Sequence, residues 1–130
     1  MNNSEGKIKQ GKKILIIEDE NELCDFIGLR LERNGFEVIA ANDGVEGLNK
    51  ARVEKPDLII LDLMLPKMPG EEVCKQVRKD AGICEIPIIM LTAKCSDADR
   101  VIGTVIGANV YMAKPFEGAK LMQAINELLG

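Results

Sequence analysis

The sequence contains no histidine and no tryptophan, and both absences narrow the possible functions. Without histidine, the chain cannot form a Ser–His catalytic pair, bind a metal through imidazole or carry a phosphohistidine of its own. Any phosphoryl group that comes from a histidine must therefore come from another protein. Aromatic residues make up only 3% of the chain, which leaves few rings on which a flavin could stack.

Long apolar segments and targeting signals are also missing. No apolar run approaches the ~20 residues that a membrane-spanning helix needs. Residues 1–13 are polar and rich in lysine, without the apolar centre of a signal peptide. We therefore expect a cytoplasmic protein that does not enter the membrane. We predict a disordered tail over residues 1–10 and a single folded domain over residues 11–130.

The spacing of the cysteines and the net charge argue against a disulfide-bonded, a metal-thiolate and a nucleic-acid-binding protein. The four cysteines are far apart and form no CxxC pair, so we expect small apolar fillers rather than disulfides or metal ligands. The net charge of -4 disfavours direct binding of nucleic acid, which requires a basic surface. No P-loop or GxGxxG motif follows the first apolar run, which argues against a nucleotide-binding domain.

Short apolar runs are the strongest positive signal in the chain. Residues 13–17, 58–61, 86–91 and 110–113 form such runs, and residues 36–41 are a plausible further strand. Continuous short runs are typical of strands buried on both faces of a parallel sheet. Helical periodicity separates them, within residues 23–31, 45–51, 73–77, 97–107 and 121–129. The alternation predicts an α/β fold, a doubly wound five-stranded parallel sheet with five helices.

Polar residues stand at the ends of these runs. Glu18 and Asp19 follow the first, Asp62 follows the run 58–61, Thr92 follows the run 86–91, and Lys114 follows the last. The carboxyl ends of parallel strands meet at one edge, so these side chains should converge there. Three carboxylates in one pocket repel each other unless a cation neutralises them. Hard oxygen ligands suit Mg²⁺.

Each of these features has an ordinary structural interpretation when it is taken alone. An acidic pair after a strand often stabilises the N-terminus of a helix, a threonine often caps a helix, and a lysine before proline is usually a surface residue. Their occurrence together, at the ends of successive strands, favours a functional site.

The segment 61–70 (LDLMLPKMPG), together with the acidic pair, the segment 91–94 (LTAK) and the segment 114–116 (KPF), resembles the receiver domain of two-component response regulators. The similarity covers residues from about 12 to 130. It implies a flavodoxin-like sheet with the strand order 2-1-3-4-5 and a site near the switch point between the first and third strands.

The resemblance implies a phosphorylation site with a bound metal. Asp62 would accept a phosphoryl group from a phosphohistidine of a sensor histidine kinase or histidine phosphotransferase. Glu18, Asp19, Asp62 and the backbone carbonyl of Met64 would hold Mg²⁺. The chain would act as a signalling switch rather than an enzyme, since it would catalyse only its own phosphorylation and slow dephosphorylation.

The resemblance also implies a switch. Thr92 and Lys114 would contact the phosphoryl oxygens, and the Lys114–Pro115 peptide bond would be cis. Tyr111 occupies the position of the family's rotating aromatic residue, which would turn inward when Thr92 moves toward the phosphoryl group. The surface of the fourth helix, fifth strand and fifth helix would then change and regulate a downstream protein target.

Departures from the family pattern concern the oligomeric state. Members that dimerise through charged pairs carry two acidic residues before the switch aromatic, where this chain has Asn109 and Val110. The last helix also lacks the arginines used in those pairs. We therefore expect a monomer or a weak dimer. The chain is either a separate small regulator or a receiver cut from a longer protein.

Two other classes remain as alternatives. A phosphorylation-independent pseudo-receiver, which would act only as a binding module, should lack at least one of the site residues, and none is missing. An aspartate-nucleophile phosphatase needs a second aspartate two residues after the nucleophile, where Met64 stands. Because Met64 has no polar group to position a water, we expect a long-lived phosphoryl state.

Overall fold

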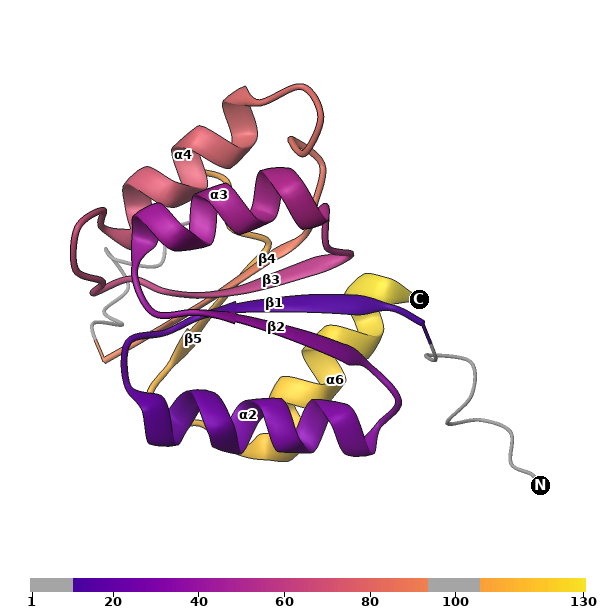
Figure 1. Ribbon diagram of the computed structural model, residues 1–130. Helices are drawn as coiled ribbons and strands as arrows, with labels where there is room; N and C mark the ends of the chain where they lie inside the picture. Colours follow the sequence, from indigo (N-terminus) through magenta and orange to yellow (C-terminus); the bar gives the residue numbers. More distant parts are fainter. Residues whose placement is uncertain (1–10, 94–105) are drawn as a thin grey trace.

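The computed structural model describes residues 11–93 and 106–130, which form one five-stranded parallel sheet covered by helices (Figure 1). The strand order is β2-β1-β3-β4-β5, the order that the family resemblance implied. The predicted tail over residues 1–10 lies outside the described residues. The strands are β1 (Lys13–Ile17), β2 (Glu37–Ala41), β3 (Leu58–Asp62), β4 (Ile88–Thr92) and β5 (Val110–Ala113).

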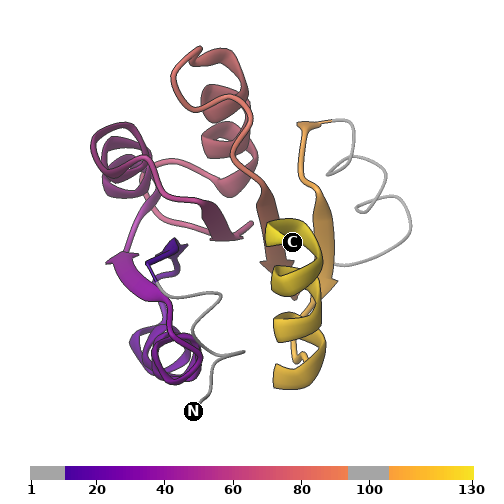
Figure 2. The ribbon, with the colours of Figure 1, turned by 90° about the vertical axis from the view of Figure 1, so that its right-hand side faces the viewer.

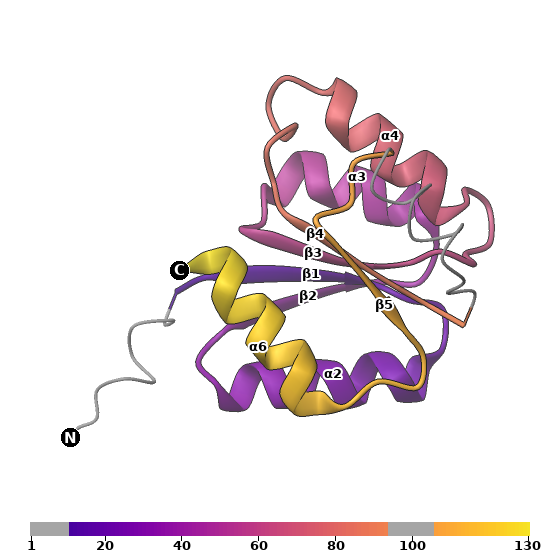
Figure 3. The ribbon, with the colours of Figure 1, turned by 180° about the vertical axis from the view of Figure 1, so that it is seen from behind.

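Four helices in the described part of the chain pack on the two faces of the sheet. They are α2 (Asn21–Arg33), α3 (Gly44–Glu54), α4 (Gly70–Lys79) and α6 (Gly118–Leu129). Helices α3 and α4 cover one face, and α2 and α6 cover the other (Figures 1 and 2). Strand β5 forms one edge of the sheet (Figure 3). The predicted fourth helix, over residues 97–107, lies almost entirely outside the described residues.

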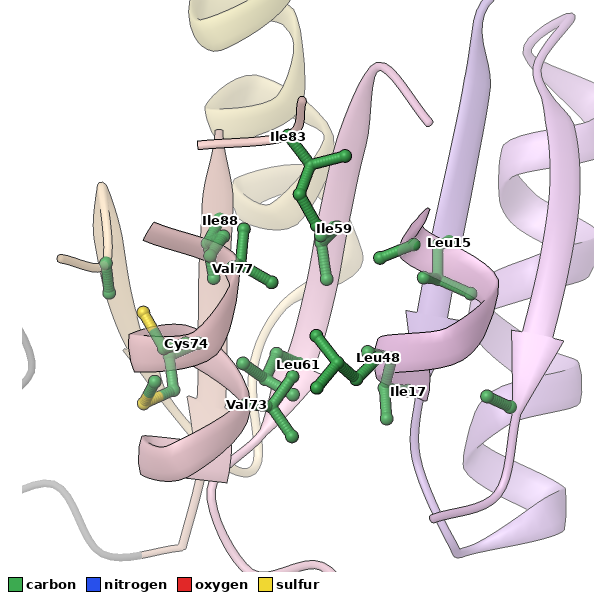
Figure 4. Packing of buried hydrophobic residues seen from close by; sticks show 14 of the residues in the cluster. Leu15, Ile17, Leu48, Ile59, Leu61, Val73, Cys74, Val77, Ile83 and Ile88 are labelled. Carbon is green, nitrogen blue, oxygen red and sulfur yellow. The ribbon is translucent and has the colours of Figure 1, made fainter. Parts of the chain in front are cut away.

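The apolar runs are continuous because both faces of the sheet are buried. In β1, Leu15 and Ile17 join the cluster under α3 and α4, while Ile14 and Ile16 join the cluster over α2 and α6. All residues of β3 and β4 are buried in the same two-sided manner. Figure 4 shows the first of these clusters, between the sheet and α3 and α4. Burial on both sides removes the polar alternation that a half-exposed strand would show.

The predicted helix positions are confirmed for the four described helices, with one difference in packing. Phe26 belongs to the apolar periodicity of α2, yet it is 52% exposed, and its neighbour Leu29 is 50% exposed. The buried stripe of α2 instead runs through Cys24, Ile27 and Leu31, on the side of the helix that faces the sheet. Phe26 and Leu29 lie beside this stripe and line a groove of about 860 Å³ between α2 and α6.

The cysteines among the described residues, Cys24, Cys74 and Cys84, are free thiols, and the first two are buried. Cys95 lies outside the described residues. No described helix has the length and apolar character needed to cross a membrane.

Candidate functional site

The register of the sheet brings the acidic residues together. Ile17 of β1 pairs with Leu61 of β3, so the next residues, Glu18 and Asp62, lie side by side at the carboxyl edge. The pairing of β1 with β2 continues one residue further, because the backbone N–H of Glu18 donates to the carbonyl of Ala41 (3.0 Å). Glu18 is therefore held at the carboxyl edge of the sheet by the same hydrogen-bond ladder that builds the sheet.

The same edge receives residues from β4 and β5. Asp62 pairs with Leu91 of β4, so Thr92 ends β4 directly beyond it. Thr92 in turn pairs with Ala113 of β5, and the backbone N–H of Lys114 donates to the carbonyl of Thr92 (2.8 Å). Parallel pairing thus places residues from distant parts of the sequence at one edge, as the sequence analysis predicted.

Three carboxylates form a compact cluster at this edge. Glu18, Asp19 and Asp62 each offer an oxygen, and these oxygens lie within 4.8 Å of one another. Glu18 and Asp62 are only 2% and 5% exposed, whereas Asp19 is exposed. Backbone amides fix the buried pair: the N–H of Glu20 donates to Oε2 of Glu18, and the N–H of Met64 donates to Oδ1 of Asp62, both at 3.1 Å.

The ammonium of Lys114 neutralises part of this charge. Its Nζ lies 2.9 Å from Oε1 of Glu18 and 3.1 Å from Oδ2 of Asp62. It also lies 3.1 Å from Oε1 of Glu20, a contact that the sequence analysis did not predict. The lysine side chain is only 15% exposed, so these ion pairs are partly shielded from water.

Burial and ion pairing act in opposite directions on the pKa values of Glu18 and Lys114. Burial raises the pKa of Glu18 to about 7, although the hydrogen bond from Lys114 acts in the opposite direction. Burial alone would lower the pKa of Lys114. Hydrogen bonds with Glu18 and Asp62 outweigh it, however, so the pKa of Lys114 lies above its ordinary value.

The donor set fits a hard divalent cation. One lysine faces several carboxylates, and a buried glutamate that tends to keep its proton indicates that additional positive charge would be favourable. Carboxylate and carbonyl oxygens are the ligands that Mg²⁺ prefers, and the exposed Asp19 leaves the cluster open toward water. The chemistry and arrangement of these residues therefore suit the cation that the sequence predicted.

The remaining predicted site residues differ in their burial and contacts. Thr92 is fully buried. Tyr111 is partly buried and packs against the apolar cluster under α3 and α4. The side chain of Met64 is 58% exposed, next to the backbone amide that holds Asp62. The Lys114–Pro115 peptide bond is cis, the configuration that the resemblance implied.

Glu20 is the site residue that sequence reasoning missed. It is the third acidic residue of the run Glu18-Asp19-Glu20, of which only the first two residues are predicted to belong to the site. Its contact with Lys114 depends on the path of the chain as it enters α2, which no residue pattern specifies. A third adjacent carboxylate at the predicted strand end was the available signal.

A doubly wound sheet of this order, with an acidic pocket and a lysine at its carboxyl edge, defines a flavodoxin-like α/β domain of the response regulator type. The family model for the response regulator receiver domain matches residues 14–126. The chain therefore belongs to the receiver domains of two-component response regulators. Domains of this family bind Mg²⁺ at an acidic pocket.

Individual relatives agree with this assignment. The alkaline phosphatase synthesis transcriptional regulatory protein PhoP of Bacillus subtilis is 48% identical over 118 residues, which cover 91% of this chain and 48% of that protein. The probable transcriptional regulator ycf27 of Guillardia theta is 42% identical over 118 residues, covering 91% of this chain and 45% of that protein. The chain thus spans about half the length of the curated relatives it matches.

Solved structures show the same fold. The receiver domain of the Francisella response regulator 1452 superposes with a TM-score of 0.86 at 30% identity, covering 92% of this chain and 97% of that one. The chemotaxis response regulator CheY4 of Vibrio cholerae superposes with a TM-score of 0.86 at 33% identity, covering 91% of this chain and 98% of that one.

Proposed function

We propose that the chain is a phosphorylation-activated signalling switch whose phosphoacceptor is Asp62. The observation that carries this proposal is the setting of the Asp62 carboxylate at the end of β3. A backbone amide fixes its Oδ1, and its Oδ2 lies 3.1 Å from the Lys114 ammonium. A carboxylate held in this manner can act as a nucleophile toward phosphorus.

The phosphoryl donor is a phosphohistidine of a sensor histidine kinase or histidine phosphotransferase, since the chain has no histidine of its own. An oxygen of Asp62 forms a bond to phosphorus while the bond between phosphorus and the imidazole nitrogen breaks. The electron pair of that bond leaves with the imidazole, which takes up a proton. No general base is needed in the chain, because the attacking group is already a carboxylate.

Positioning and charge are what the chain contributes to the transfer. Lys114 brings a positive charge to the phosphoryl oxygens, and Thr92 lies at the end of the neighbouring strand, where its hydroxyl can donate to them. Glu18, Asp19, Asp62 and the backbone carbonyl of Met64 would hold Mg²⁺. When bound, the cation neutralises the acidic cluster and the negative charge of the transferred group.

The output is a population shift between two arrangements of the domain. Thr92 moves toward the phosphoryl oxygens, and the ring of Tyr111, now partly buried against the core, turns further inward. The surface near β5 and α6 then changes and regulates a downstream protein target. Beyond its own phosphorylation and slow dephosphorylation, the chain catalyses no reaction.

The chain acts in the cytoplasm as a monomer or weak dimer and does not bind nucleic acid directly. Asn109, which stands where charge-paired dimers have an acid, is engaged within its own chain. Its Oδ1 accepts from the guanidinium of Arg78 (3.0 Å) and from the backbone N–H of Ile88 (2.8 Å). Because Asn109 is neutral and makes these contacts within its own chain, it is not expected to form a charged pair with a second copy.

Intact-mass analysis tests the proposal. The protein and its Asp62→Asn variant are incubated with acetyl phosphate, with and without Mg²⁺. We expect the mass of one phosphoryl group to appear only in the unmodified protein and only with Mg²⁺. If neither protein gains mass from acetyl phosphate or from a phosphorylated histidine donor, the chain is a phosphorylation-independent binding module instead.

A further inference from the structure

Glu20 stands at the start of α2, but its side chain contacts the lysine of the site instead of capping the helix. It is the N-cap residue of this helix, but its side chain makes no capping hydrogen bond. Its Oε1 instead lies 3.1 Å from Nζ of Lys114. Glu20 also lies outside the group of three carboxylates that could hold a cation, which comprises Glu18, Asp19 and Asp62. It therefore contacts the lysine of the site without belonging to the metal cluster.

The contact with Glu20 occupies the third N–H donor of the Lys114 ammonium. An ammonium has three N–H donors, and Lys114 has three carboxylate partners, at 2.9 Å for Glu18 and 3.1 Å for both Glu20 and Asp62. A phosphoryl group on Asp62 therefore cannot receive a hydrogen bond from Lys114 unless one of these partners is given up or shared. The resting position of the ammonium is fully occupied.

The three partners differ in what happens to them when a cation binds. Glu18 and Asp62 belong to the candidate metal cluster, so a bound cation would compete with Lys114 for their oxygens. Glu20 is outside that cluster and 66% exposed, and its carboxylate stays available to the lysine. An exposed ion pair of this kind contributes little to folding stability. The ion pair between Glu20 and Lys114 instead fixes the position of the Lys114 ammonium.

We propose that Glu20 is a positioning residue that holds the Lys114 ammonium in its resting place and thereby competes with the phosphoryl group for it. The part of this inference that concerns phosphorylation rests on the proposed function. Once a cation competes for Glu18 and Asp62, the Glu20 carboxylate is the charged partner that still holds Lys114, and removing its charge weakens that hold on the ammonium. The site then becomes easier to phosphorylate, because the donor no longer has to be withdrawn from an ion pair.

The rate of phosphorylation by acetyl phosphate at saturating Mg²⁺ tests this competition. We expect Glu20→Gln to raise the rate about two- to fivefold, the range that an exposed ion pair corresponds to. Glu20→Asp keeps the charge but shortens the reach, and it should behave like Glu20→Gln. The control Glu22→Gln removes a charge from the first turn of the same helix and should leave the rate unchanged.

A Lys114→Met background separates the contact from a general effect of charge. The increase should vanish there, because no ammonium remains to be released. If Glu20→Gln has the same effect with and without Lys114, or if Glu20→Asp behaves like the unmodified protein, the proposal is overturned. The contribution of Glu20 would then be a repulsion of the anionic donor.

A second readout does not depend on phosphorylation. The ¹⁵N NMR signal of the Lys114 ammonium reports on its hydrogen bonds in the resting protein. We expect faster hydrogen exchange of this ammonium in Glu20→Gln, because a neutral amide oxygen is a weaker acceptor than the carboxylate it replaces. An unchanged signal overturns the positioning role. If the unmodified protein fails to gain a phosphoryl group while this signal changes, the proposed function fails but the hold of Glu20 on Lys114 stands.

Discussion

Gly70, the first residue of α4, packs so closely against the backbone carbonyl of Asp62 that a Cβ atom at Gly70 would overlap that oxygen. The backbone N–H of Gly70 also donates to the carbonyl of Leu63 (2.9 Å). The start of α4 therefore rests directly on the strand end that carries the candidate phosphoacceptor. This contact explains why the segment after Asp62 needs a glycine at this distance along the chain.

Replacing this glycine should damage both stability and the site. We expect Gly70→Ala to lower the free energy of unfolding by about 3 kcal/mol, the upper part of the range for overpacked positions, because the overlap is with backbone atoms that cannot rotate away. Phosphorylation by acetyl phosphate should fall with it, since Asp62 must shift. Urea unfolding and intact-mass analysis would measure the two effects.

Gly28→Ala is the matched control. Gly28 is buried in the middle of α2, and its nearest neighbour would be a side-chain carbon of Val38 at 3.5 Å, an ordinary contact distance. Because alanine favours a helix interior by up to ~1 kcal/mol over glycine, this variant should be as stable as the unmodified protein or slightly more stable. Equal losses in both variants would contradict the close packing of Gly70 on Asp62.

Lys114 should weaken the binding of a divalent cation in the resting protein. Its Nζ lies 2.9 Å from a carboxylate oxygen of Glu18 and 3.1 Å from one of Asp62, two residues of the candidate metal cluster. Removing this positive charge with Lys114→Met should raise the affinity for Mg²⁺ by at least about tenfold. A tenfold change corresponds to about 1.4 kcal/mol, whereas two unit charges ~4 Å apart interact by about 4 kcal/mol at an effective dielectric constant of ~20. Isothermal titration calorimetry would measure the change.

A lysine remote from the pocket provides the comparison for this prediction. Lys120 is 73% exposed on α6 and pairs with Glu117. Lys120→Met removes the same charge from the chain, and screening should leave the Mg²⁺ affinity nearly unchanged. If Lys114→Met binds Mg²⁺ no more tightly than Lys120→Met, the ammonium does not compete with the cation.

The raised pKa of Glu18 predicts that Mg²⁺ binding depends on pH. Its folded-state pKa of about 7 lies above the ordinary 4.5, so the folded, metal-free protein keeps a proton on Glu18 that the unfolded chain has already lost between these values. Folding stability should therefore fall as the pH rises from 4.5 through 7. A cation must displace this proton, so its Kd should rise about tenfold for each unit below pH 7.

Calorimetric titrations with Mg²⁺ at several pH values would test this dependence. Glu18→Gln removes the titrating group, and the slope of affinity against pH should flatten in this variant. The decline of stability between pH 4.5 and 7 should also be smaller in Glu18→Gln than in the unmodified protein. Identical slopes in the two proteins would show that another group governs the pH dependence.

Much of this architecture follows from the sequence because the strands are buried on both faces. The run that ends at Asp62 contains only apolar residues, and β3 is fully buried, so the run specified both the strand and the point where it ends. Once parallel pairing is assumed, the ends of β1, β3, β4 and β5 must lie at one edge. The cluster of Glu18, Asp19 and Asp62 follows from that geometry without further information.

Other features depend on contacts that a one-dimensional pattern does not contain. Phe26 fits the period of α2, but the helix faces the sheet through a neighbouring stripe, which leaves the ring about half exposed beside α6. Glu20 has the sequence position of a solvated helix start, yet its carboxylate lies 3.1 Å from the Lys114 ammonium. In both cases the outcome depends on how one element is oriented against another rather than on the elements themselves.

Met64 should control how long the phosphoryl group remains on Asp62. Its backbone N–H already holds Oδ1 of Asp62, and its side chain is 58% exposed at the mouth of the site. A thioether is a poor partner for a water molecule, so the phosphoryl state should be long-lived. Met64→Asn places an amide there that can orient an attacking water, and it should shorten the lifetime by on the order of tenfold, less than the 10²–10⁴ of a true general base.

The decay of the phosphorylated mass with time, after removal of acetyl phosphate, would measure this lifetime. Met64→Leu keeps the site apolar and should decay as slowly as the unmodified protein. Fast decay in the unmodified protein, or the same lifetime in Met64→Asn and Met64→Leu, would mean that the water approaches from a direction that Met64 does not border.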